Sequence, residues 1–346
     1  MNSTKRVFYY DALRAMAIIG IVFCHVSVYF LSFGFNSPGF SSVAFLDCLR
    51  DFSIPIFVML SGALLIGRDE SFKVFFKKRL SRLLIPFLFW AAVYIIYSCS
   101  YTLENIISIF FGHTGSLGVI FWFVWMMIMM YIGIFVINKI ISFTGKSAIY
   151  VLTVLSLIYF ISIRFGFDPY SPMIVYFASF ITYIIIGYFI SSNDFIGSRV
   201  DGRILTIFTL AVSVLLYCYY IFCFVVPKSQ ANGIFVSLGY FTPLLFILSV
   251  NVFIFFKYLD RTRVMDRIES GRIGDVISVI SRYSFGIYLV HYLIIDFLKL
   301  NVLSYIPHFN TFFEIILIVI FTLIISLALL YIFDRIPFLN RFSGTH

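Results

Sequence analysis

Residues 9–31 of this chain read YYDALRAMAIIGIVFCHVSVYFL, an apolar run long enough to cross a lipid bilayer as one helix. The run nevertheless contains Asp11, Arg14 and His25. A helix rises about 1.5 Å and turns about 100° per residue, so Arg14 and His25 lie about 16 Å apart on nearly the same face. Asp11 precedes Arg14 by three residues and can pair with it. Ionisable side chains within a span face the protein interior, so this face is predicted to belong to a functional site.

The composition of the whole chain agrees with a membrane protein. Of its 346 residues, 62% are hydrophobic and 12% are charged, which is too little polar surface for a soluble chain of this length. The fold class is therefore predicted to be all-α and polytopic, a single membrane domain over residues 1–346 with about ten transmembrane helices. The predicted spans are 9–32, 50–67, 83–101, 119–137, 148–165, 173–191, 204–225, 236–256, 284–300 and 312–333.

The Lys and Arg residues indicate the orientation of these spans. Six alternate connections and termini hold 20 of the 25 Lys and Arg residues, whereas the opposite connections hold three. Because positive residues concentrate on the cytoplasmic side, both termini are predicted to be cytoplasmic. The net charge of +9 therefore reflects topology and contact with membrane lipids, and no nucleic-acid partner is expected.

Two of the predicted cytoplasmic connections are long and polar. In residues 68–82, basic residues alternate with Phe at helical spacing, which predicts an interfacial helix before the third span. Residues 257–283 predict another short amphipathic helix. At the end of the first connection stand Arg79 and Arg82, which have two interpretations: contacts with anionic lipid, or a clamp for a phosphorylated ligand.

Six short motifs follow one another along nearly the whole chain. They are Asp11-x-x-Arg14 with His25, Ile54-Pro55 leading to Ser61-Gly62, Arg79-x-x-Arg82, Phe121-Trp122-Phe123 with Tyr131, Ser284-Phe285-Gly286-Ile287-Tyr288 with His291, and Asp334-Arg335-Ile336-Pro337. In order, spacing and topological side they resemble the motifs of the acyltransferase-3 family of integral-membrane acyltransferases. The nearest likeness is to the short forms that acetylate O antigen and enterobacterial common antigen. One departure is Ile120, where the family commonly has a His.

The resemblance implies transfer of an acetyl group from cytoplasmic acetyl-CoA, a co-substrate, to a hydroxyl of a cell-surface glycan or lipid-linked oligosaccharide. It implies a multi-pass protein of the bacterial inner membrane that uses no metal. The residues implied are His25, Arg14 and Asp11 for catalysis, Arg79, Arg82 and Ser61 for the acetyl-CoA, and Trp122, Tyr131 and His291 for the acceptor. His25 is the candidate general base, although it has a second possible role in orienting the thioester.

Other interpretations of these residues remain open. Buried charge in ten spans also describes a secondary transporter or a glycolipid flippase, although no pair of similar halves is visible in the sequence. The same fold could use another donor, such as succinyl-CoA. Asp11, Arg14 and His25 are also compatible with hydrogen bonding between helices, His291 with hydrogen bonding in the core, and Trp122 and Tyr131 with packing between helices.

Overall fold

The computed structural model describes residues 7–31, 51–99, 101–113, 115–164, 172–194, 202–225, 242–302 and 310–345. Within these ranges every regular element is a helix, which confirms the predicted all-α fold. In chain order the elements are α1 (Phe8–Leu31), α3 (Ser53–Leu65), α4 (Phe72–Tyr97), α5 (Leu103–Phe111), η2 (Val119–Phe121), α6 (Trp122–Thr144), α7 (Ala148–Arg164), α8 (Pro172–Ser192), α9 (Gly202–Val225), α10 (Pro243–Leu259), α11 (Arg263–Glu269), α12 (Arg272–Asn301), α13 (Thr311–Arg335) and η5 (Leu339–Phe342).

Each of the ten predicted spans coincides with a helix over its described residues; residues 32, 50, 100, 165 and 236–241 of these spans lie outside the described part of the chain. Six helices of the described chain are long and apolar enough to cross a membrane, and a seventh arises if α10 and α11, bent by 84°, count as one span. Helices α3, α7 and α8 are apolar but shorter over the residues described. The chain is therefore a polytopic membrane protein.

The long polar connections differ from expectation in how they join the spans. The interfacial helix predicted within residues 68–82 continues into the third span as α4, with Pro86 inside the helix. Proline removes one backbone donor, which a helix packed among neighbours tolerates. The short amphipathic helix predicted within residues 257–283 is present as α11, and α12 begins at Arg272 within the same connection.

Helix α5 lies between the third and fourth predicted spans and was not predicted. The Thr102 hydroxyl caps its start by accepting a hydrogen bond from the Asn105 backbone N–H, at 3.2 Å. Gly112 ends it with a φ of +72°, the left-handed conformation common at helix C-termini. A helix of nine residues is too short to appear as a span in a hydropathy profile.

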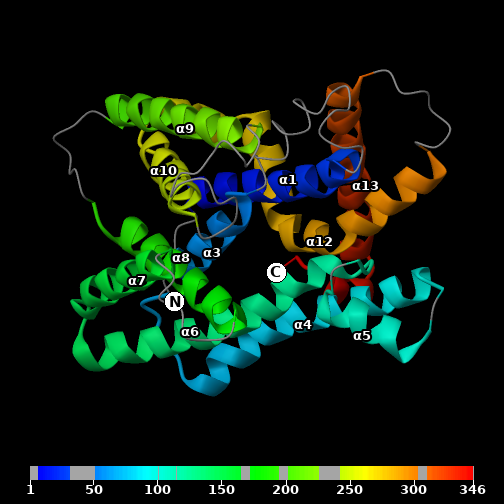
Figure 1. Ribbon diagram of the computed structural model, residues 1–346, viewed down its shortest axis with the longest axis horizontal. Helices are drawn as coiled ribbons and strands as arrows, with labels where there is room; N and C mark the ends of the chain where they lie inside the picture. Colours follow the sequence, from blue (N-terminus) through cyan, green and yellow to red (C-terminus); the bar gives the residue numbers. More distant parts are fainter. Residues whose placement is uncertain are drawn as a thin grey trace.

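Helix α1 occupies the middle of the molecule, with α9 and α10 on one side and α4 and α6 on the other (Figure 1). It packs chiefly against α12, α3 and α13. Leu13, Ala17 and Ile18 are completely buried in these contacts. A helix that is apolar around most of its circumference is expected at the centre of a bundle, and its charged face therefore meets protein.

Helices α3 and α8 lie backbone against backbone. A Cβ added to Gly62 of α3 would stand 1.9 Å from the carbonyl oxygen of Ile184, and one added to Gly187 of α8 would stand 2.1 Å from that of Met59. Reciprocal glycines allow such close approach between membrane helices. The contact fixes the position of Ser61, which neighbours Gly62.

Ion pairs join the predicted cytoplasmic connections to one another. Lys139 pairs with Asp69 at 3.0 Å, and Arg261 pairs with Asp194 at 2.9 Å. The Gly67 backbone also donates to the Asn138 side chain at 2.8 Å. These contacts bring together segments from different parts of the chain, as the predicted topology requires of connections on one side of a membrane.

Candidate functional site

The charged end of α1 forms a closed hydrogen-bonded cluster with α12. Arg14 Nη1 lies 3.2 Å from Asp11 Oδ1 and donates to Ser281 Oγ at 3.0 Å. The Ser281 hydroxyl in turn donates to Asp11 Oδ1 at 2.6 Å. The predicted pairing of Asp11 with Arg14 is thus confirmed. The partner on α12, Ser281, could not be named from the local sequence because it lies 267 residues beyond Arg14.

The other end of the same face also meets α12. The ring centroids of His25 and His291 lie 5.1 Å apart. Arg14 and His25 therefore contact the same neighbouring helix, in agreement with the face predicted from helical geometry. Arg14 contacts Ser281, and His25, further along α1, contacts His291, further along α12. The two helices therefore run parallel.

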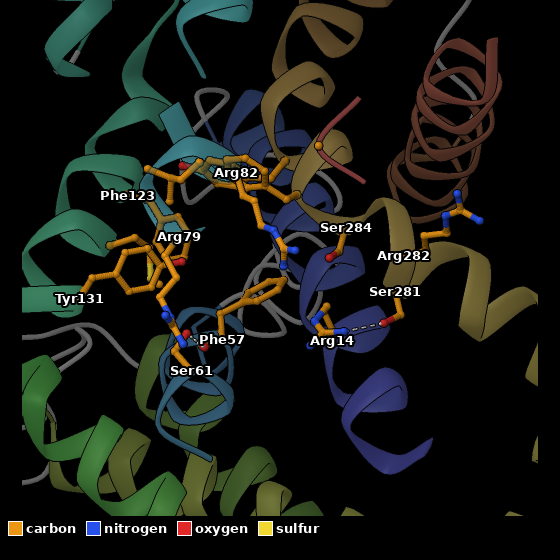
Figure 2. A pocket seen from close by; sticks show the side chains of 15 residues that line it. Arg14, Phe57, Ser61, Arg79, Arg82, Phe123, Tyr131, Ser281, Arg282 and Ser284 are labelled. Atoms are coloured by element: carbon orange, nitrogen blue, oxygen red, sulfur yellow. Dashed lines mark hydrogen bonds between the residues drawn. The ribbon is translucent and has the colours of Figure 1, made fainter. Parts of the chain in front are cut away.

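A cavity of about 350 Å³ opens at the arginine end. It is lined from α1, α3, α4, α6, α12 and the segment after η5, and Figure 2 shows the side chains around it. Five of the predicted site residues line it: Arg14, Ser61, Arg79, Arg82 and Tyr131. The Ser61 hydroxyl donates to the carbonyl of Phe57, one turn earlier, at 3.0 Å. Its oxygen lone pairs are therefore the part of Ser61 that can serve a ligand.

The two arginines of the third motif occupy different environments. Arg79 is 7% exposed, pairs with Glu70 at 2.5 Å and donates to the Phe75 carbonyl at 3.0 Å. Its guanidinium carbon also stands 3.9 Å from the centre of the Phe75 ring. Arg82 is exposed, and among the described residues it has no hydrogen bond or acidic partner. Arg82 is therefore the more available of the two for an anionic ligand.

Arg282, a further lining residue, turns its guanidinium away from the cavity (Figure 2). Its Nη2 donates to Asp334 Oδ2 at 2.8 Å. The same carboxylate accepts from the Tyr283 hydroxyl at 3.0 Å and, through Oδ1, from Thr345 Oγ1 at 2.9 Å. Asp334 thus ties the start of the ninth-span motif to the segment after η5.

That segment forms part of the cavity wall. Gly344 lines the cavity, and the neighbouring Ser343 is completely buried. Trp90 Nε1 donates to the carbonyl of Phe342 at 3.0 Å. A Cβ on Gly286 would stand only 2.1 Å from the Ser343 carbonyl oxygen, so a glycine there is what lets the segment approach α12.

A second cavity, of about 60 Å³, lies at the histidine end. The predicted site residues that line it are His25 and Trp122, and the rest of its lining is mostly apolar, with Ile21, Cys24, Ile54, Ile120, Phe123 and Tyr288. Phe123 and Tyr288 line both cavities, and their ring centroids are 5.1 Å apart. The two aromatic side chains therefore stand between the two cavities.

The predicted aromatic acceptor platform is divided between the cavities. Trp122 lines the smaller one beside His25, whereas Tyr131 lines the larger one with the arginines. The two residues are nine positions apart on α6, which separates them by about 13 Å along the helix axis. A single platform made of both side chains does not form. His291 and Asp11 line neither cavity. His291 contacts the ring of His25, and Asp11 pairs with Arg14.

Several lining residues were not among the predicted ones: Phe57, Phe123, Ser281, Arg282, Ser284, Tyr288 and Gly344. For Phe123, Ser284 and Tyr288 a signal existed, because Phe123 belongs to the fourth-span motif and the other two to the ninth-span motif. Ser281, Arg282 and Gly344 carry no comparable local signal. Within the described residues, no three His, Cys, Asp or Glu side chains are grouped so that they could hold a metal ion.

Comparison with known proteins gives one match. No curated protein and no solved structure matches the chain. A family model described as an acyltransferase domain matches residues 7–331, which is nearly the whole chain and includes both cavities except for Gly344.

Proposed function

This chain belongs to the acyltransferase-3 family and is a membrane acyltransferase, and from that premise we propose its donor, acceptor and base. We propose that it moves an acetyl group from cytoplasmic acetyl-CoA to a hydroxyl of a cell-surface glycan or lipid-linked saccharide, in the bacterial inner membrane. The acceptor is of the O-antigen or enterobacterial common antigen type. The observation that carries the proposal is that an arginine-lined cavity and a histidine-containing cavity are neighbours and share Phe123 and Tyr288 in their walls.

The larger cavity is the proposed donor site. Coenzyme A carries several phosphate charges, and guanidinium groups bind phosphate through two parallel hydrogen bonds. Arg82 is exposed and has no acidic partner in the described part of the chain, so it is the proposed first contact for a phosphate. Arg79, buried against Glu70, shapes the wall and adds positive potential. The thioester end of the donor then extends inward along α1 toward His25.

The smaller cavity is the proposed reaction chamber. His25 takes the proton of the acceptor hydroxyl as its oxygen attacks the thioester carbonyl, and returns that proton to the departing thiolate of coenzyme A. Arg14, held by Asp11 and Ser281, organises the donor at the inner end of the arginine cavity. Trp122 lines the chamber beside His25 and is the proposed stacking surface for the acceptor sugar.

The size of the smaller cavity favours a short acyl group. The volume of this cavity is about 60 Å³, less than a fifth of the roughly 350 Å³ of the larger one. An acetyl group fits such a space, whereas a succinyl group would bring a charged carboxylate against Ile21, Ile54 and Ile120. Burying an unpaired carboxylate among apolar side chains is strongly unfavourable. This is the argument for acetyl-CoA over succinyl-CoA.

Two measurements test the proposed function. Purified protein in lipid nanodiscs should release free coenzyme A from acetyl-CoA when an acceptor glycolipid is supplied, and should use succinyl-CoA at least tenfold more slowly. Mass spectrometry of surface glycans should show an acetyl group in the parent strain and the complemented deletion strain that is missing from the deletion strain. Identical glycans in all three strains would contradict the proposal. Movement of the acceptor glycolipid across the membrane without release of coenzyme A would also contradict it and would favour a flippase.

A further inference from the structure

His291, on α12, is a completely buried histidine whose proton position follows from its contacts. Its Nδ1 lies 2.7 Å from the carbonyl oxygen of Tyr288 and 3.1 Å from that of Ile287. A carbonyl oxygen can only accept, so Nδ1 must carry the hydrogen and donate it. In the neutral ring the other nitrogen, Nε2, then presents a lone pair.

That lone pair has no hydrogen-bond partner in the described structure. Buried polar atoms are almost always paired, so an unpaired one inside a well-packed region calls for an explanation. The hydrogen bonds of Nδ1 to the helix backbone account for one ring nitrogen and leave the burial of the other unexplained. The unsatisfied Nε2 indicates instead an acceptor kept for a donor that is present during only part of the reaction cycle.

The neighbouring group that can become such a donor is His25. Nδ1 of His291 faces its own helix backbone, so Nε2 lies on the side of the ring away from that backbone. The ring centroids of His25 and His291 are 5.1 Å apart, and the ring of Tyr292 lies 5.2 Å from that of His25 and 6.5 Å from that of His291. Ring centroids 5.1 Å apart are close enough for one nitrogen of each ring to reach hydrogen-bonding distance when the two nitrogens face each other.

We propose that His291 is a positioning residue for His25: its Nε2 accepts an N–H hydrogen bond from His25 once His25 has taken the acceptor proton. The proposal rests on the proposed function. In the reaction the acceptor oxygen forms a bond to the acyl carbon, the carbon–sulfur bond breaks, and the hydroxyl proton passes to His25 and then to the thiolate sulfur. His291 neither gains nor loses a proton in this sequence. It orients the imidazolium of His25 and stabilises it for the duration of the transfer, as the third group of a nucleophile–base pair does.

Two substitutions separate the two ring nitrogens. In His291→Asn the amide N–H can still donate to the backbone carbonyls, but nothing occupies the place of Nε2. In His291→Gln the longer side chain carries its amide group to about the place of Nε2. We expect His291→Asn to lower kcat about 100-fold while the KM for acetyl-CoA stays within about twofold, and His291→Gln to recover about tenfold of that loss. Equal kcat values for Asn, Gln and the unaltered protein would overturn the proposal.

A double-substitution test covers the case in which both variants are weakened by poor folding. If His291 acts through His25, His291→Asn should change the residual rate less than about twofold when His25 is already Ala. A full additional loss in that background would show that the effect of His291 is independent of His25 and would overturn the proposal. If the rate of acetyl transfer depends on His25 but is unchanged by substitution of His291, only this inference is refuted. Absence of transfer by the unaltered protein refutes the proposed function itself.

Discussion

The two cavities share Phe123 and Tyr288 but differ in volume, in charge and in the polarity of their walls. The larger, about 350 Å³, is lined by four arginines, one of them exposed and without an acidic partner among the described residues. The smaller, about 60 Å³, combines one histidine with mostly apolar walls. Charge recognition tolerates an open, wet site, whereas proton transfer benefits from a small site with little water. Under the proposed function, the comparison means that donor binding and acyl transfer are separated along α1.

The strongest test of this separation is His25→Ala, which should lower kcat for acetyl transfer about 1,000-fold, since general base catalysis contributes on the order of 10²–10⁴. Acetyl-CoA binding, measured by calorimetry on the purified protein, should stay within about twofold because the histidine does not line the arginine cavity. His113→Ala is the matched control, because His113 is exposed and lines neither cavity. Near-normal transfer by the His25→Ala variant would show that the smaller cavity is not the reaction chamber.

The wall of the larger cavity can be disturbed through Gly286→Ala. The new Cβ would stand 2.1 Å from the Ser343 carbonyl oxygen, so the segment after η5 must move. We expect the free energy of unfolding to fall by about 2 kcal/mol, the usual range for overpacking, together with weaker acetyl-CoA binding. Gly133→Ala is the control, because its Cβ would meet only the Ile181 side chain at an ordinary 3.6 Å. Equal behaviour of the two variants would mean that the segment does not form the cavity wall.

The two arginines of α4 should respond differently to removal. Arg82→Ala should raise the KM for acetyl-CoA about tenfold, equivalent to about 1.4 kcal/mol, with little change in kcat or stability. Arg79→Ala should in addition lower the thermal unfolding midpoint, because it leaves the Glu70 carboxylate without its closest cation.

Lys77→Ala is the control for both, since Lys77 is exposed on the same helix and lines neither cavity. Matching losses of stability in the Arg79 and Arg82 variants would erase the distinction between a wall residue and a ligand-facing one.

The smallest expected effect concerns the length of the acyl chain that the enzyme accepts from the donor. Ile54→Ala should enlarge the smaller cavity and raise the rate with butyryl-CoA relative to acetyl-CoA about fivefold, less than the 10-fold or more that a well-fitted pocket can give per methylene. Ile56→Ala on the same helix is also a truncation in the core, because Ile56 is completely buried but lines neither cavity. The ratio of the two rates should be unchanged in that control. An identical ratio in both variants would mean that the acyl group does not occupy this cavity.

Much of the fold followed from local pattern. Apolar runs of about 20 residues located ten helical segments, because a bilayer imposes that length whatever the neighbours are. Helix α5 was missed because its nine residues are too few to produce such a run. The interfacial helix within residues 68–82 and the third span were predicted as separate elements, whereas α4 runs through both, because a change from polar to apolar sequence does not by itself end a helix.

The candidate site was also predictable only in part from the sequence. The sequence by itself determined that Asp11 pairs with Arg14 and that Arg14 and His25 share a face, since helical geometry relates positions a few turns apart. Only the tertiary structure decided that Ser281 closes the cluster, that Glu70 binds Arg79 and leaves Arg82 exposed, and that Phe123 and Tyr288 stand between two cavities. Those contacts depend on which helices lie side by side, and hydrophobic periodicity records that a face is buried without recording what buries it.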